Sequence, residues 1–432
     1  MASTTNPAAV PYTTATIFRF KPFRTLWMAQ LVSVFGDFLA LFGVISLITF
    51  RWHGTAVQVT TITMAFVLPI ALIGPVAGVF VDHWNVKRLM IASDLIRAGL
   101  ILMLLFVQNV SQIAIILFAI SVVSSFFTPA QSVTMRTVIP AEGLLPANAL
   151  MSQAFYLVRL ASPLIAGMLV AWLTEKACFY LDAASFIFSA TMISRLAINR
   201  PARAQAEKNI KSLTQDFLAG NKFIFTHAGL AFVFLAMAIA MFIMSSFSPL
   251  ISIYIRDSLQ AGPRMFGVIS SMVGVGMILG SMLVTRLVRS RSKSHVVLGG
   301  LFSLGLGALL LGGFHNIPMA ALSTFTMGFA IAFILVPAQT MSQQETPPDM
   351  VGRVSSTFMS LISFSQVFGL LLSGYLAQIL GIRPLFIACA AALAVISAAG
   401  YLMMRGRPIT AAVSASAAPN EAGQSSAASS QS

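Results

Sequence analysis

The chain has 432 residues, of which 57% are hydrophobic and only 9% are charged, and its formal net charge is +14. A soluble domain carries roughly 25% charged residues, so this composition excludes a water-soluble globular fold. The bilayer must be the solvent for most of the chain. Long apolar stretches without strict polar–apolar alternation favour helices over a β-barrel, which predicts an all-α integral membrane protein.

Twelve stretches are apolar and long enough to cross a membrane as helices, which takes about 20 residues each. Residues 1–16 are polar and uncharged and lack an apolar core followed by a cleavage site, so we expect no removable signal peptide. In chain order, the predicted spans are 25–50, 57–81, 89–107, 111–135, 148–172, 177–197, 229–255, 264–287, 294–313, 317–342, 353–380 and 384–404.

A long polar interruption at residues 195–222 divides the spans into two groups of six. With the N-terminus placed inside, 19 of the 26 Lys and Arg residues fall in cytoplasmic segments and five fall in outer loops. This excess follows the positive-inside rule, so the basic charge predicts topology, with both termini cytoplasmic, rather than a nucleic-acid partner. We expect a cytoplasmic N-terminal segment (1–24), an N-terminal six-helix bundle (25–197), a cytoplasmic linker (198–228), a C-terminal six-helix bundle (229–404) and a disordered cytoplasmic tail (405–432).

The two groups of spans share short elements at a constant offset. Pro129-Ala130-Gln131, at the end of the fourth span, recurs 208 residues later as Pro337-Ala338-Gln339. At the same offset, Met151 meets Met359 at the start of a fifth and an eleventh span. Their equivalent placement predicts a duplicated unit, with two six-helix pseudo-repeats.

The segment Gly74–Met90, between the second and third spans, reads GPVAGVFVDHWNVKRLM. Gly78, Asp82 and Lys87 match the pattern G-x-x-x-D-R-x-G-R-[RK]. The segment resembles the loop between membrane helices two and three of the major facilitator superfamily. The resemblance implies a twelve-helix secondary transporter that works by alternating access, with its halves rocking about a central site near the midplane.

Other segments of the N-terminal half resemble one branch of that superfamily. The run SDLIRAG around Asp94, the segment Pro146–Leu169 and the Gly36-Asp37 pair are similar to those of drug and siderophore exporters, such as macrolide-efflux and enterobactin-exporter proteins. In that branch the loop charges form a cytoplasmic gate, although generic anchoring of loops is the alternative. The gate residues that the resemblance implies are Gly78, Asp82, Lys87, Arg88, Asp94, Arg97, Arg136 and Arg353.

Asp37 stands alone in a long apolar stretch, with no other charge between Arg24 and Arg51. An ionised carboxylate deep in a membrane is costly, so such a residue usually faces a partner or a water-filled cavity. Arg159 lies at a matching depth in the fifth span. We therefore expect an Asp37–Arg159 pair beside the central cavity, either as a proton- or substrate-binding site or as an ion pair that locks two helices.

Pro163 and Gly167 lie within the fifth span, where export members of the superfamily often carry a Gly-Pro motif. Proline and glycine in a membrane helix permit bending or close packing, so these residues are a candidate hinge or a packing site.

Adaptable and polar side chains suggest a site for cargo. Methionines and phenylalanines at helical spacing suit a permissive pocket or simple core packing. Uncharged glutamines within spans suit cargo binding or bonds between helices. The residues are Met237, Met241, Met244, Phe325, Phe329 and Phe333, together with Gln30, Gln131, Gln339 and Gln366.

The sequence contains no ATP-binding G-x-x-x-x-G-K-[ST] loop, no HExxH or paired-cysteine metal site and no nucleophile–base set. We therefore expect no enzyme, catalytic residue, metal or cofactor. The expected function is export of an amphipathic small molecule, a drug or siderophore-like metabolite, by proton antiport across the bacterial cytoplasmic (inner) membrane. The protein is expected to be a monomer in the lipid bilayer. The alternatives are a lysophospholipid or other lipid-like cargo, or a non-transporting membrane assembly factor.

Overall fold

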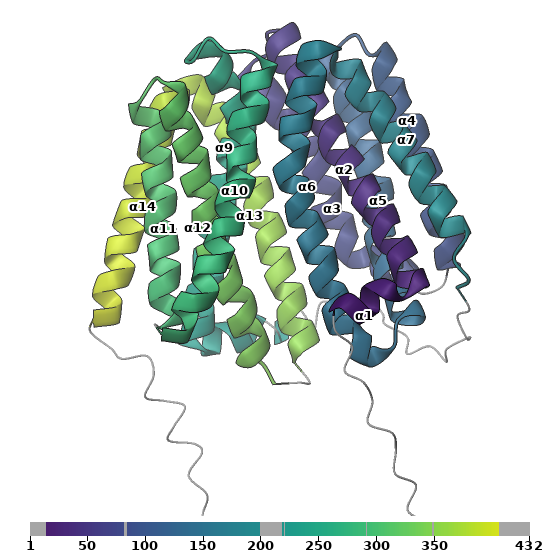
Figure 1. Cartoon of the computed structure of the whole chain (residues 1–432). Helices are drawn as coiled ribbons and strands as arrows, with labels where there is room; N and C mark the ends of the chain where they lie inside the picture. The colour runs from purple at the N-terminus through teal and green to yellow at the C-terminus, as the bar shows by residue number, and fades with distance from the viewer. Residues whose placement is uncertain are drawn as a thin grey trace, which may run out of the picture.

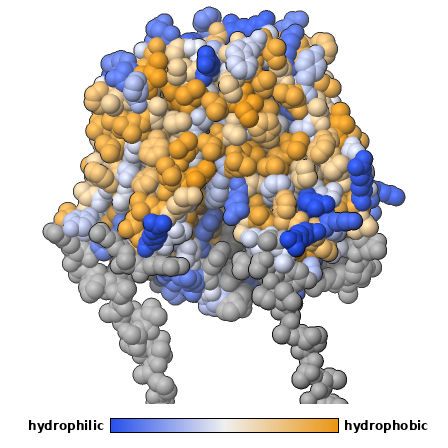
Figure 2. All heavy atoms as spheres, viewed as in Figure 1, coloured by the Kyte–Doolittle hydropathy of each residue, from blue (hydrophilic) through white to orange (hydrophobic). Residues whose placement is uncertain are grey.

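The computed structural model describes residues 14–81, 84–198, 218–219, 221–290, 292–347 and 350–405. Twelve helices in these ranges are long and apolar enough to cross a membrane, and the same ranges contain no strand. The helices stand side by side in one bundle (Figure 1). Apolar side chains cover the middle of the face shown in Figure 2, and hydrophilic side chains gather at its upper rim. The all-α fold that the composition predicts is therefore confirmed.

Each membrane helix begins and ends within about one turn of its predicted span. A short helix, α1 (Thr14–Arg19), precedes them, and α2 starts inside the predicted N-terminal segment 1–24. The membrane helices are α2 (Lys21–Ser46, continued by the π-helical Leu47–Arg51), α3 (Ala56–Val81), α4 (Val86–Met103), α5 (Val110–Val138), α6 (Leu144–Trp172), α7 (Glu175–Ser194), α9 (Ala228–Asp257), α10 (Pro263–Ser290), α11 (Lys293–Gly313), α12 (Ile317–Gln344), α13 (Val351–Leu380) and α14 (Ile382–Arg405).

Local chemistry explains several of these boundaries. Asn85, Asn109 and Asn316 each accept a hydrogen bond through their side chain from the backbone N–H three residues later, which caps α4, α5 and α12. Gly381 follows α13 with a φ of 84°, a conformation that suits glycine at a helix C-terminus. Most of the predicted linker 198–228 and tail 405–432 lies outside the described residues.

The second six helices repeat the packing of the first six. In the N-terminal half α3 packs on α5, α4 on α7 and α2 on α6. In the C-terminal half α10 packs on α12, α11 on α14 and α9 on α13, the same pairs after a duplication. Pro129 and Pro337 lie inside the equivalent helices α5 and α12. The duplication inferred from the sequence thus appears as two six-helix bundles.

The two halves meet along two equivalent helix pairs, α6 with α10 and α3 with α13. A methyl group added at Gly167 in α6 would lie 2.8 Å from the Cα of Gly267 in α10. A methyl group added at Gly374 in α13 would overlap Thr60 in α3. Small residues let helix backbones approach closely in membranes, so both joints are built from glycines.

The halves are also tied together on the side of the membrane away from α1 and from the end of α14 (the upper side in Figure 1). Thr49 and Ser252 share a hydrogen bond of 3.0 Å between their hydroxyl groups. Arg256 Nη1 donates to the backbone oxygens of Thr49 at 2.8 Å and Gly54 at 2.9 Å. Beneath them Phe42 stacks on Phe266 with ring centroids 4.3 Å apart. We call Thr49, Ser252, Arg256 and the Phe42–Phe266 stack the closed-side contacts.

Candidate functional site

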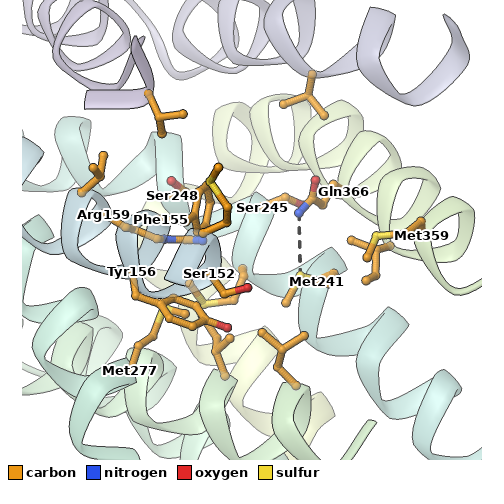
Figure 3. Close-up of a pocket in the computed structure, with 18 of the residues that line it drawn as sticks. Ser152, Phe155, Tyr156, Arg159, Met241, Ser245, Ser248, Met277, Met359 and Gln366 are labelled. Carbon is orange, nitrogen blue, oxygen red and sulfur yellow. Dashed lines mark hydrogen bonds between the residues drawn. The ribbon is translucent and has the colours of Figure 1, made fainter. Parts of the chain in front are cut away.

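A cavity of about 650 Å³ lies between the two halves (Figure 3). Its wall is formed by α2, α3, α5 and α6 of the N-terminal half and by α9, α10, α12 and α13 of the C-terminal half. Met151, Gln339 and Met359 line it within a few turns of the helix ends on the α1 side. The cavity therefore extends toward the helix ends on the α1 side, while the closed-side contacts lie on the other.

The four glutamines that the sequence singles out all line this cavity: Gln30, Gln131, Gln339 and Gln366. Gln131 and Gln339 are the repeat-related glutamines, so the duplication places one amide on each side of the cavity. Gln366 Nε2 donates to Met241 Sδ at 3.7 Å, the dashed line in Figure 3. The buried Gln30 Oε1 accepts no hydrogen bond from any described residue. These amides offer donors and acceptors to a bound molecule.

Methionines form much of the apolar wall. Met237, Met241 and Met244 of α9 line the cavity, so of the two interpretations open for them, a permissive pocket or core packing, the structure supports the pocket. Three more come from other helices, and the repeat-related Met151 and Met359 are among them. Methionine is unbranched and polarizable, so it adapts to cargo of irregular shape. A cavity of this size falls within the range of small-molecule sites, roughly 300–1,000 Å³.

The phenylalanines of α12 belong to a different surface. Phe325, Phe329 and Phe333 stack on one another with centroids 6.3 Å and 4.5 Å apart. Methyl groups added at Gly276 and Gly280 of α10 would strike the backbone of Phe325 and Phe329. Of the two interpretations open for these three residues, a permissive pocket or core packing, the structure supports packing, where α12 crosses α10.

Arg159 on α6 lines the cavity beside Phe155 and near Tyr156 (Figure 3). Its guanidinium has no hydrogen bond or ion pair with any residue in the described part of the chain. The predicted Asp37–Arg159 pair is thus wrong. Equal depth in the membrane puts two residues at the same level, but it does not say which way their helices face. Helix α2 is rotated so that Asp37 lies toward α4 and α7.

Asp37 instead belongs to a buried cluster of charges inside the N-terminal half. Its Oδ2 lies 3.8 Å from Arg97 Nη1, and Arg97 also forms an ion pair with Asp94 one turn earlier on α4. Asp94 and Arg97, three residues apart in the sequence, thus meet on one face of α4. Phe127 and Phe186 flank the guanidinium, with their ring centroids 4.6 Å and 4.3 Å from Cζ. Such a sandwich adds cation–π attraction to the ion pairs.

Asp182 on α7 completes this cluster and was not identified from the sequence. It is 1% exposed, and Ser185 Oγ donates to its Oδ1 at 3.2 Å. A methyl group added at Gly36, next to Asp37, would overlap both Asp182 and Ser185. Asp182 is the single acidic residue in the predicted span 177–197, and this position is the sequence signal that could have identified it. We call Asp37, Asp94, Arg97 and Asp182 the buried charge cluster.

The other described residues predicted for the gate lie near helix ends on the α1 side: at the end of α3, the start of α4, the end of α5 and the start of α13. Lys87 donates through Nζ to the backbone oxygen of Leu196 at 2.8 Å, while Arg88, Arg136 and Arg353 are exposed. Gly78 lies near the end of α3, and Asp82 lies outside the described residues. Asp94 and Arg97, also among the predicted gate residues, are buried inside the N-terminal half beside Asp37, and the gate role of the whole set stays a prediction.

Pro163 and Gly167 lie at the crossing of α6 and α10. The backbone oxygen of Pro163 and the Cα of Gly167 face Gly267 so closely that a methyl group there would overlap both. Of the two interpretations open for these residues, the structure supports close packing, at a joint between the halves.

Comparisons with known proteins agree with this geometry. The chain is 27% identical over 399 residues to the uncharacterized major facilitator-type transporter YfiS of Bacillus subtilis, covering 90% of this chain and 94% of YfiS. It is 24% identical over 379 residues to the macrolide efflux protein A of Streptococcus pyogenes, covering 84% and 91%. It is also 24% identical over 361 residues to the multidrug efflux pump Tap of Mycolicibacterium fortuitum, covering 80% and 88%.

Solved structures share the fold. A mutant of the nucleoside transporter NupG superposes with a TM-score of 0.73 at 12% identity, covering 89% of this chain and 100% of that chain. An inward-facing, unoccupied bacterial homologue of the lysosomal transporter Spinster gives a TM-score of 0.69 at 12% identity, covering 89% and 97%. The model of the family described as "transmembrane secretion effector" matches residues 12–427. The chain belongs to this family of major facilitator transporters, and it is a multi-pass membrane protein that carries small molecules rather than an enzyme.

Proposed function

We propose that this transporter exports an amphipathic small molecule, which binds in the central cavity. The observation that carries the proposal is the cavity itself. Both halves line it, and its lining is rich in methionine and contains four uncharged glutamine side chains. Apolar pockets with a few placed polar groups are typical of small-molecule sites. The printed names of two relatives, a macrolide efflux protein and a multidrug efflux pump, support export as the direction.

The excess of basic residues in one set of loops supports a cytoplasmic location for both termini, in the inner membrane of a bacterium. The cavity then opens to the cytoplasm, where cargo for export must be loaded. The working unit is a monomer, in which the two bundles of one chain enclose the cavity between them. The N-terminal (25–197) and C-terminal (229–404) bundles act as the two moving bodies, joined by the linker 198–228.

Alternating access follows from the contacts that separate the two sides. The closed-side contacts involve few residues, chiefly Thr49, Ser252 and Arg256. The joints at Gly167–Gly267 and Thr60–Gly374 lie between the same bundles and are formed by small residues. The halves can therefore rock about these joints, breaking the closed-side contacts while the cavity mouth shuts.

The buried charge cluster supports proton antiport. It holds three carboxyl groups and one guanidinium, so full ionisation would leave an excess of negative charge between helices. An unpaired buried charge is very costly, and a proton removes that cost. Asp37 is the most exposed member, with 24% of its side chain exposed, and lies one turn from the cavity residue Val34 on α2. Protonation of Asp37 removes its negative charge and weakens its ion pair with Arg97, which joins α2 to α4 inside the N-terminal bundle.

The experiment is proton-gradient-dependent accumulation in everted membrane vesicles. The panel contains a macrolide, a lipophilic cationic dye, a catecholate siderophore and a lysophospholipid. We expect one of the small amphipathic compounds to accumulate and to leak out when a protonophore is added. A matched variant, Gln339→Leu, removes one cavity amide and should lower that accumulation severalfold.

Two results would contradict the proposal. Accumulation of the lysophospholipid alone would replace it with a lipid-like cargo. Accumulation that persists unchanged after the proton gradient is collapsed would exclude proton antiport.

A further inference from the structure

Arg159 gives the central cavity a single positive charge. The described residues that line the cavity include no Asp, Glu or Lys, and Arg159 is their one charged member. The carboxylates within the membrane helices of the N-terminal half are engaged elsewhere, because Asp37 and Asp94 pair with Arg97. The cavity wall is thus cationic as well as apolar.

The guanidinium is available to a ligand. Arg159 is half-buried, and it makes no hydrogen bond or ion pair with any described residue. A guanidinium carries five N–H donors in a planar fork, which matches the two oxygens of a carboxylate, sulfonate or phosphate. A half-buried charge without a partner is costly, so an anionic ligand would supply what the cavity lacks.

The surroundings of Arg159 define the rest of the ligand. Tyr156 lies near the charge and adds a hydroxyl group, and Ser152 and Gln30 line the cavity on the same half with a hydroxyl and an amide. Across the cavity stand Met237, Met241 and Met244, whose side chains suit an apolar body. A cationic amphipath would meet the same apolar wall with no carboxylate to neutralise it.

We propose that the cavity selects an amphipathic organic anion, whose acidic head binds Arg159 and whose apolar body packs on the methionines of α9. This inference rests on the cavity being the cargo site, as proposed above. It adds the charge of the cargo, which neither the family nor the names of the relatives specify.

The test compares two dyes that share a fluorophore and a chain of similar length but differ in charge. Dansyl-6-aminohexanoate is anionic, and dansylcadaverine is cationic. Their binding to the full chain in lipid nanodiscs is followed by dansyl fluorescence for wild type, Arg159→Gln and Arg159→Lys. Arg286→Gln, which removes an exposed charge outside the cavity on α10, is the matched control.

We expect wild type to bind the anionic dye about tenfold or more tightly than the cationic dye, as charge-assisted hydrogen bonds allow. Arg159→Gln should abolish this preference, Arg159→Lys should restore part of it, and Arg286→Gln should leave it intact. Equal binding of the two dyes to wild type, preference for the cation, or an unchanged preference in Arg159→Gln would each overturn the inference. Failure to bind either dye would overturn it as well.

A second readout separates this inference from the proposed function. Uphill movement of each dye in everted vesicles reports transport, whereas the nanodisc titration reports charge selection alone. Anion-selective binding without gradient-dependent movement of either dye would contradict the exporter proposal and support the anion site. Gradient-dependent movement of the cationic dye that is equal in wild type and Arg159→Gln would support the exporter proposal and contradict the anion site.

Discussion

The two halves of this transporter share one helical plan but divide the charged residues unequally. The buried charged side chains among the described residues are Asp94, Arg97, Glu175 and Asp182, and all belong to the N-terminal half. The offset of 208 residues places Ser245, Phe302, Gly305 and Ala390 where the N-terminal half has Asp37, Asp94, Arg97 and Asp182. The duplicated unit thus carries a charge cluster in one copy and uncharged side chains at the equivalent positions of the other.

The same offset explains a difference in packing. Gly36 and Gly43 let α2 lie close along α7, against Asp182 and Cys178. The equivalent positions of α9 hold Met244 and Ile251, and α9 makes few contacts with α14. Met244 turns to the cavity instead. One half is therefore specialised for holding charge, and the other supplies adaptable side chains to the cargo site.

The largest effect is expected from Arg97→Met, which removes the cation of the buried charge cluster that distinguishes the N-terminal half. We expect a loss of about 3–5 kcal/mol of stability, because removing one partner leaves buried carboxylates uncompensated. Thermal unfolding of the purified protein in detergent measures the effect. Adding Asp94→Asn to Arg97→Met should recover part of the loss. A single variant as stable as wild type would show that the cluster is not an ion-paired unit.

A smaller effect is expected from Gly36→Ala, which places a methyl group against Asp182 and Ser185. Overpacking of this kind costs about 1–3 kcal/mol. The matched control is Gly99→Ala in α4, where an added methyl group meets nothing within 4 Å. The two unfolding temperatures are compared directly. Equal temperatures for both variants would contradict the close approach of α2 to α7.

The smallest effect is expected where the halves meet on the closed side. Thr49→Val removes the hydrogen bond to Ser252, which is worth about 0.5–1.5 kcal/mol and so shifts the balance of states by roughly two- to tenfold. A cysteine at Met241 in the cavity, with Cys178 and Cys389 replaced by alanine, reports access to an impermeant maleimide from outside. Labelling should rise in Thr49→Val. It should not rise in the control Thr326→Val, whose hydroxyl bonds within its own helix.

The sequence predicted the parts of the molecule that depend on hydropathy and on the repeat. Span lengths follow from apolar composition, and the shared Pro-Ala-Gln elements placed Gln131 and Gln339 in equivalent positions of one cavity. Helical spacing put Met237, Met241 and Met244 of α9 on one face, but the sequence left open whether that face meets the cavity or packs in the core.

Properties that depend on helix rotation could not be predicted. Asp37 and Arg159 lie at matching depths in the membrane, so the sequence suggested an ion pair between them. The rotation of α2 instead brings Asp37 into an ion pair with Arg97. The spacing of Phe325, Phe329 and Phe333 suits a cavity and a helix crossing equally, and only the glycines of α10 decide between them. Asp182 escaped notice because the charged residues around it, Asp37, Asp94 and Arg97, lie on two other helices far from it in the sequence.

The central claim is that proton coupling belongs to the N-terminal charge cluster and cargo binding to the cavity. Its most direct test reconstitutes Asp37→Asn in liposomes with a transported compound. Two rates are measured: exchange at equal cargo concentration on both sides, and uphill accumulation driven by a pH gradient. We predict that Asp37→Asn keeps exchange and loses uphill accumulation. Uphill accumulation at the wild-type level in Asp37→Asn would contradict the claim.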